Sequence, residues 1–168
     1  MVEDDGATLK FSFEPVADAH TRLLILGSLP GEASLSRAQY YAHARNQFWR
    51  LVETVIGAPL PAAYEARLEA LLAHGVGLWD VVRQARRVGS LDSAIRDHRP
   101  NALMELVESL PALRAVAFNG GKASQLGRAL LENRTGLPLL SLPSSSPAYT
   151  ASLETKASAW SSLRAFLD

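Results

Sequence analysis

The chain alternates short apolar runs with longer segments of helical periodicity. Apolar runs occupy residues 23–26, 77–82, 115–118 and 139–142. Because these runs lack a regular polar alternation, they are typical of strands that are buried on both faces of a parallel sheet. Helices are expected over residues 47–57, 62–74, 101–110, 122–133 and 152–166. Residues 1–20 are polar and are expected to be irregular.

This order of elements predicts an α/β fold in a single domain over residues 1–168. Strands that alternate with helices form a parallel sheet with helices on both faces, so we expect a three-layer α/β/α sandwich around a mainly parallel four-stranded sheet. Ligands bind such sheets beyond the carboxyl ends of the strands. The loops expected there are residues 27–46, 119–122 and 143–149. The first shows little helical periodicity, and long loops in compact domains are often functional.

The composition and charge of the chain limit the kinds of protein that it can be. Of 168 residues, 48% are hydrophobic and 20% are charged, which favours a packed core over disorder. The 17 basic and 17 acidic residues cancel, which argues against a protein that coats DNA non-specifically but permits a local basic face. No run resembles a signal peptide or approaches the roughly 18 apolar residues of a membrane span, so a soluble, cytoplasmic protein without membrane contact is expected.

Metal and thiol chemistry are not expected. The chain has no cysteine, and its four histidines lack the close spacing of metal ligands. Two glycine-containing loops also lack nucleotide signatures. Residues 27–31 (GSLPG) match neither the dinucleotide nor the P-loop pattern, and in residues 119–124 (NGGKAS) an alanine follows Lys122, so the pattern alone favours a tight turn with a surface lysine.

The loop at residues 143–147 (PSSSP) is stiffened by its prolines and offers hydroxyl and N–H donors. Such a loop can lie against a phosphodiester backbone, or it can be a plain surface connection. A serine nucleophile is a further option, but no G-x-S-x-G elbow surrounds these serines.

Residues 40–49 (YYAHARNQFW) place aromatic, basic and amide side chains at a predicted helix start. Loop aromatics can stack on a nucleic-acid base. On the residues alone, Asn46 could simply cap the helix, and His43 could be structural or catalytic. Phe48 and Trp49 are more typical of a core.

Several separated blocks together resemble the hypoxanthine-DNA glycosylases, a branch of the uracil-DNA glycosylase superfamily. The blocks are GSLPG at 27–31, QYYAH at 39–43 with RN at 45–46 and FW at 48–49, residues 75–80 with GSLD at 89–92, FNG at 118–120, and LPSSSPA at 142–148. They run in family order from about residue 22 to residue 160. The resemblance implies the uracil-DNA glycosylase fold and an enzyme of base excision repair that flips a deaminated base out of DNA and hydrolyses its glycosidic bond.

The resemblance also implies roles for individual residues. Asn46 would hold the attacking water and Tyr41 would stack on the base. An amide cannot act as a general base at neutral pH, so catalysis would rest on positioning and electrostatics and would suit bases that leave as stabilised anions. The base pocket would comprise Gly27, Ser28, Tyr41 and Asn119, and the DNA-binding loop Pro143, Ser144, Ser145, Ser146 and Pro147. Supporting positions would be Pro30, Gly31, His43, Arg45, Lys122 and Tyr149. No cofactor is implied, and the expected partner of the monomer is double- or single-stranded DNA that contains a deaminated base.

Three positions depart from related sequences. Ser28 stands where the mismatch-specific uracil and thymine glycosylases carry a water-positioning asparagine, which leaves that role to Asn46. Tyr149 replaces a usual asparagine, and Ala44 a usual proline. Hypoxanthine is the expected base, with xanthine and uracil as further candidates. The alternatives are a uracil-DNA glycosylase for mismatched or single-stranded DNA, a non-catalytic damage sensor, and a serine hydrolase that uses the 144–146 cluster.

Overall fold

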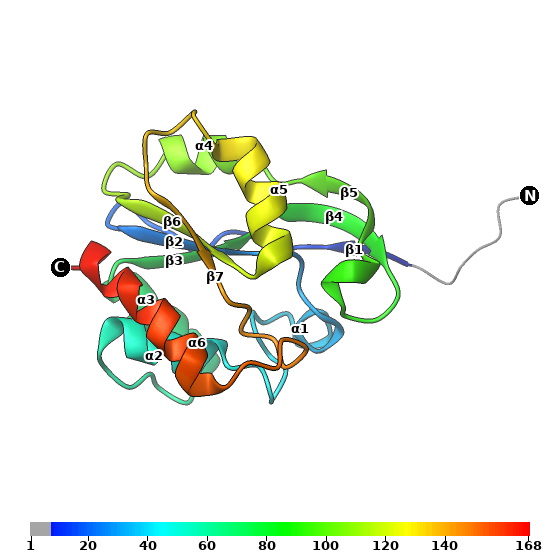
Figure 1. Ribbon diagram of the computed structural model, residues 1–168, viewed down its shortest axis with the longest axis horizontal. Coiled ribbons are helices and arrows are strands. Elements are labelled where there is room, and N and C mark those ends of the chain that lie inside the picture. The colour runs from blue at the N-terminus through cyan, green and yellow to red at the C-terminus, as the bar shows by residue number, and fades with distance from the viewer. Residues whose placement is uncertain (1–7) are drawn as a thin grey trace, which may run out of the picture.

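The computed structural model describes residues 8–168, and a parallel sheet of four strands lies at its centre (Figure 1). The strands follow the spatial order β3-β2-β6-β7, and all three pairings are parallel. Their bounds are Leu23–Gly27 for β2, Val76–Asp80 for β3, Ala115–Asn119 for β6 and Leu139–Leu142 for β7. The predicted four-stranded sheet is therefore confirmed.

Helices cover both faces of this sheet, as Figure 1 shows. One face carries α2 (Phe48–Ile56), α3 (Tyr64–Ala73) and α6 (Leu153–Trp160), and the other carries α4 (Leu103–Glu108) and α5 (Gly121–Leu131). Each face of the sheet has its own hydrophobic core, and alternate residues of β2 point to opposite faces. Ile25 packs in the core that contains α2, and Leu26 packs in the core that contains α4 and α5. Because both faces are buried, the strand needs an unbroken apolar run, and the predicted three-layer sandwich is confirmed.

The predicted helices are present, with boundaries that shift by a few residues. Gly57, at φ 72°, ends α2 in the left-handed conformation that glycine adopts readily. The Oγ of Ser152 caps α6 by accepting a hydrogen bond from the N–H of Thr155 at 3.1 Å. The last helix is shorter than predicted, because α6 ends at Trp160 and the chain continues as a 3₁₀-helix over Ser161–Phe166.

A second, antiparallel sheet was not predicted. Its order is β1-β4-β5, with β1 at Thr8–Phe11, β4 at Val82–Arg87 and β5 at Arg96–Pro100. Two expectations are therefore wrong: residues 8–11 are not irregular, and residues 77–82 are not one strand, since β3 ends at Asp80. Charged residues dominate β4 and β5, so pairing between the strands rather than local apolar pattern determines their conformation. Residues 1–7 of the expected irregular segment lie outside the described residues.

The segment 27–46 is not wholly a loop, because it contains the helix α1 (Glu32–Arg37). This helix has six residues, and Ser34 is its buried one, so no apolar stripe indicated it. A 3₁₀ turn at Asp92–Ala94 lies in the connection between β4 and β5. Both short elements lie close to the carboxyl ends of β2 and β3, where they help to enclose the site.

Candidate active site

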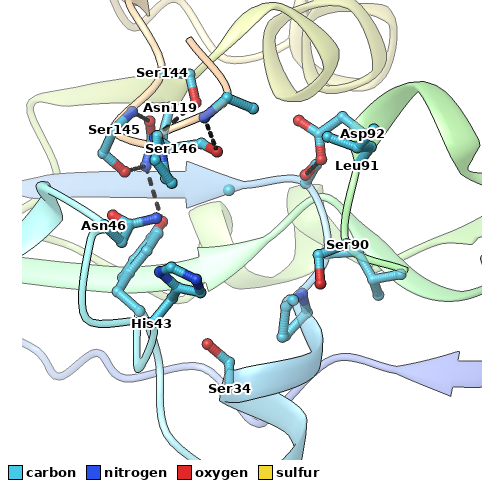
Figure 2. Close-up of a pocket in the computed structure, with 18 of the residues that line it drawn as sticks. Ser34, His43, Asn46, Ser90, Leu91, Asp92, Asn119, Ser144, Ser145 and Ser146 are labelled. Atoms are coloured by element: carbon cyan, nitrogen blue, oxygen red, sulfur yellow. Dashed lines mark hydrogen bonds between the residues drawn. The ribbon is translucent and has the colours of Figure 1, made fainter. Parts of the chain in front are cut away.

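A cavity of about 710 Å³ opens at the carboxyl ends of the central strands, where the sequence predicted a binding site. Figure 2 shows Asn46 and His43 on one side, with Leu91 and Asp92 opposite. Asn119 and the serines that follow β7 close a third side. The cavity is thus formed by the β2–α2 segment, the β4–β5 loop, the end of β6 and the β7–α6 loop.

Most of the residues that the sequence proposed for the site line this cavity. They are Gly27, Ser28, Pro30, Gly31, Tyr41, His43, Arg45, Asn46, Asn119, Ser144, Ser145, Ser146, Pro147 and Tyr149. Pro143 and Lys122 are outside the lining. The carbonyl of Pro143 accepts a hydrogen bond from Trp160 Nε1 at 2.9 Å, which ties the serine loop to α6, and Lys122 is half-buried in the first turn of α5.

Asn46 is held by the start of α2. Its Oδ1 accepts a hydrogen bond from the N–H of Phe48, the first residue of α2, at 3.0 Å. Gln47 occupies the N-cap position and makes no side-chain cap bond, so Asn46 is not the helix cap that the sequence allowed but the residue before it. The next N–H, of Gln47, donates to the carbonyl of Ser145 at 3.0 Å and joins this segment to the serine loop. The hydrogen bond from Phe48 fixes the orientation of the Asn46 amide, and Asn46 lines the cavity.

Tyr41 is fixed more rigidly than a loop residue usually is. Its backbone lies at φ 51°, a conformation that is unusual for a bulky residue and is often retained at functional sites. Its ring stacks on Phe48, with the ring centroids 3.8 Å apart and the planes 13° apart. Its carbonyl accepts a hydrogen bond from Trp49 Nε1 at 3.1 Å. One face of the Tyr41 ring is therefore committed to the core.

The Asn119 side chain joins three parts of the site. Its Oδ1 accepts from the N–H of Ser145 at 2.9 Å, and its Nδ2 donates to Ser145 Oγ at 2.9 Å and to the Tyr41 hydroxyl at 3.3 Å. Both ends of the amide therefore already have protein partners. This arrangement suits a residue that positions Tyr41 and the serine loop, and its predicted contact with a base edge stays a prediction.

The three serines of the β7–α6 loop act as acceptors within the protein. Ser145 Oγ accepts from Asn119, and the hydroxyls of Ser144 and Ser146 accept from the N–H groups of Ser146 and Ala148 at 3.1 Å. A nucleophilic serine would instead need to donate its proton to a base. The observed contacts support a structured loop rather than the serine-hydrolase alternative.

Two carboxylates of the site were not assigned a role from the sequence. Asp80 ends β3, is 4% exposed and lines the cavity. Burial, and secondarily the charge of Asp92, raise the pKa of Asp80 to about 7, although the Arg87 cation opposes this shift. Asp92 accepts a hydrogen bond from Ser28 Oγ at 2.5 Å. The available signal was the resemblance itself, because Asp80 and Asp92 stand at the ends of two of its blocks, residues 75–80 and 89–92.

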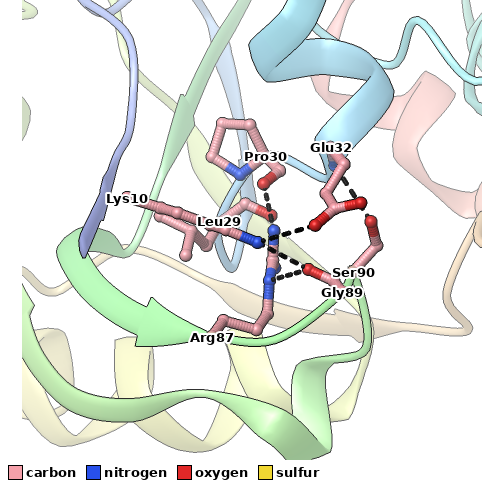
Figure 3. A network of polar contacts seen from close by, with 7 residues as sticks. All are labelled: Lys10, Leu29, Pro30, Glu32, Arg87, Gly89 and Ser90. Carbon is pink, nitrogen blue, oxygen red and sulfur yellow. Dashed lines mark hydrogen bonds and ion pairs between the residues drawn. The ribbon is translucent and has the colours of Figure 1, made fainter. Parts of the chain in front are cut away.

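A buried arginine of the second sheet supports the loop after β2 (Figure 3). Arg87 donates hydrogen bonds to the carbonyls of Leu29 and Pro30 and, at 3.0 Å, to that of Gly89. Lys10 of β1 donates to the same Gly89 carbonyl at 2.9 Å. The unpredicted sheet therefore holds two walls of the cavity together.

Lys156 supports the serine loop from the other side. It is almost fully buried, and its ammonium donates to the carbonyl of Ser146 at 3.1 Å. The same group lies 5.4 Å from the centre of the Tyr149 ring, at the range of a cation–π contact. Tyr149 is half exposed at the rim of the cavity, so the residue that departs from related sequences has a defined place.

Within residues 8–168, no group of three or more histidine, cysteine, aspartate or glutamate side chains is placed to hold a metal ion. No helix of the same part of the chain is both long and apolar enough to span a membrane.

Comparisons with known proteins agree with this architecture. A Uracil DNA glycosylase superfamily profile matches residues 14–166. Proteins named Hypoxanthine DNA glycosylase from Methanosarcina barkeri and Methanosarcina acetivorans are each 41% identical to this chain over 90% of its length and over 95% and 96% of their own. The solution NMR structure of a uracil DNA glycosylase candidate from Methanosarcina acetivorans has a TM-score of 0.84 and 40% identity, and the match covers 95% of this chain and 99% of that one. The chain belongs to the uracil DNA glycosylase superfamily.

Proposed function

We propose that this protein is a monofunctional DNA glycosylase that hydrolyses the bond between deoxyribose and a flipped deaminated base, with hypoxanthine as the preferred base. The observation that carries the proposal is the position of Asn46, whose amide is fixed by a helix N–H in the wall of a cavity. The names of the two Methanosarcina relatives support hypoxanthine as the base.

The target nucleotide would leave the duplex and enter the cavity, which is easiest for a mispaired base. One face of the Tyr41 ring packs on Phe48, so its other face would stack on the base. Asn119 would hold Tyr41 and Ser145 in place for this contact. The base would thus stack on an aromatic ring that is already held in place by the core.

Asn46 would hold a water molecule beneath C1′ of the sugar. As the glycosidic bond breaks, its electron pair leaves with the base, and the water oxygen bonds to C1′. One water proton remains on the new hydroxyl and the other is released to solvent, while the base leaves as an anion that then takes up a proton from solvent. Because an amide does not remove a proton at neutral pH, the rate would depend on positioning and on stabilisation of the departing anion.

The serine loop would contact the DNA backbone around the flipped nucleotide. Ser144, Ser145, Ser146 and their flanking prolines lie in or beside one wall of the cavity. Phosphate contacts of this kind position a protein without reading sequence. We further propose that the enzyme acts as a monomer on cytoplasmic, nucleoid-associated DNA.

A panel of oligonucleotides tests the proposed activity. Each would carry one hypoxanthine, xanthine or uracil, in single- and double-stranded form, and abasic sites would be detected by cleavage in alkali. We expect cleavage at hypoxanthine. Cleavage at uracil alone would support the uracil-DNA glycosylase alternative, whereas tight binding without abasic sites would support a damage sensor.

A further inference from the structure

We propose that Asp80 recognises the flipped base as an uncharged carboxylic acid, whose O–H donates a hydrogen bond to a carbonyl oxygen of the base. This inference rests on the proposed glycosylase function, and it assigns to Asp80 the selection of the base that enters the cavity. It makes Asp80 a residue of base recognition and of leaving-group stabilisation.

Asp80 lines the cavity from the end of β3. Asp80 pairs with Gly27 in the parallel register of β3 and β2, and its carbonyl accepts from Asn101 Nδ2 at 2.7 Å. A β-carbon at Gly27 would lie 2.6 Å from Asp80 Oδ1 and 3.0 Å from the Tyr41 hydroxyl oxygen. Only glycine therefore leaves room for the carboxyl and the aromatic ring at this point.

One oxygen of this carboxyl is unsatisfied. Asp80 Oδ2 is buried and has no hydrogen-bond partner among residues 8–168. More than nine in ten buried polar groups in proteins have such a partner, so an exception calls for an explanation. Because Asp80 lines the cavity, a ligand that enters the cavity can provide the missing partner.

The surroundings of Asp80 favour its protonated form. The charges that act on it are Asp92 in the β4–β5 loop and Arg87 in β4. Tyr40 and Tyr41 of the β2–α2 segment are titratable groups whose own pKa Asp80 helps to raise. Burial and the negative Asp92 raise the pKa of Asp80 to about 7, and the opposing Arg87 cation is engaged by backbone carbonyls. Burial also raises the pKa of both tyrosines, which keeps their hydroxyls neutral.

A neutral carboxyl matches the chemistry of a deaminated base. Deamination replaces an amino group on the base by a carbonyl oxygen, which accepts a hydrogen bond, next to a ring N–H. A protonated carboxyl can donate to that oxygen and accept from the N–H with its second oxygen. Negative charge spreads onto the base as the glycosidic bond breaks, so an O–H donor stabilises the departing base, whereas a carboxylate would repel it.

The pH dependence of excision tests this inference. Single-turnover rates on a deoxyinosine duplex would be measured from pH 5.5 to 8.5 for wild type and Asp80→Asn, with the exposed Asp97→Asn as the matched control. The wild-type rate is expected to fall by about tenfold per pH unit above pH 7, as the donor is lost. The asparagine amide donates at every pH, so the rate of Asp80→Asn relative to wild type should rise steadily over the same range. Ionisation of the substrate affects both proteins and cancels in this ratio.

The opposite results would overturn the inference. If the wild-type rate rises through pH 7, the carboxylate is the working form. If the ratio of the two rates does not change with pH, Asp80 does not act by titration. The wild-type profile tests the inference even if the variant folds poorly, and a wild type that never releases hypoxanthine would contradict the proposed function instead.

Discussion

Single residues of this site combine structural and chemical tasks. Asn46 accepts the N–H of Phe48 through Oδ1 and lines the cavity, so a backbone N–H at the start of α2 orients the group proposed to hold water. Asn119 has both ends of its amide bound to Tyr41 and Ser145. Asp80 is the exception, because one of its oxygens is left without a partner among residues 8–168. Two buried side-chain atoms of residues 8–168 have no partner, Gln47 Oε1 and Asp80 Oδ2, and only Asp80 lines the cavity, so its oxygen marks where a ligand is expected.

The raised pKa of Asp80 also has a consequence for stability. Between pH 4 and 7 the folded protein retains a proton that the unfolded chain has lost, so the free energy of unfolding decreases as pH rises through this window and levels off above it. Asp80→Asn carries no such proton. Urea unfolding should therefore show wild type losing stability relative to Asp80→Asn by up to about 1.4 kcal/mol per pH unit between pH 4 and 7. A difference between the two proteins that is the same at pH 4 and pH 8 would contradict a titrating, buried Asp80.

The elements of the central sheet were predicted more accurately than those of the second sheet. Strand β2 is buried on both faces and must be apolar throughout, which makes it visible in the sequence. Strands β4 and β5 carry several arginines that cannot be told apart in the sequence. Of these arginines, only Arg87 is buried. Burial of one arginine depends on the carbonyls of a distant loop, which no local pattern encodes.

Arg87 provides a test of the second sheet as a support for the site. Arg87→Met would leave the carbonyls of Leu29, Pro30 and Gly89 without this donor, and each buried acceptor that stays unpaired costs about 1–3 kcal/mol. We expect thermal unfolding at a lower temperature, and in the folded protein a deoxyinosine excision rate at least about tenfold lower, since small displacements of positioning residues slow catalysis. Arg83→Met, at an exposed position of the same strand, is the control. Equal rates and melting temperatures for the two variants would show that the Arg87 contacts are dispensable.

The whole molecule places its site where the sequence indicated, at the carboxyl ends of parallel strands. The resemblance in the separated blocks predicted most of the lining, including Asn46, Tyr41 and the serine loop. Leu91 and Asp92 could not be given roles, because their place in the cavity depends on how the second sheet packs beside the first. The role of Asp80 depends on its burial beside Tyr41 and Asp92, which the sequence does not show. Contacts between distant segments are a property of the fold rather than of any one motif.

The most direct test of the proposed mechanism compares wild type, Asn46→Ala and Asn46→Ser for release of hypoxanthine from a deoxyinosine duplex, with DNA binding measured in parallel. A serine hydroxyl can also accept the N–H of Phe48, so Asn46→Ser keeps an acceptor at this place but lacks the amide. We expect release by wild type, a loss of at least about 100-fold in both variants, and DNA affinity close to that of wild type, since a single preorganised polar group contributes about 10²–10³ to such rates. Release at the wild-type rate by either variant would contradict the assignment of Asn46 as the residue that holds the attacking water.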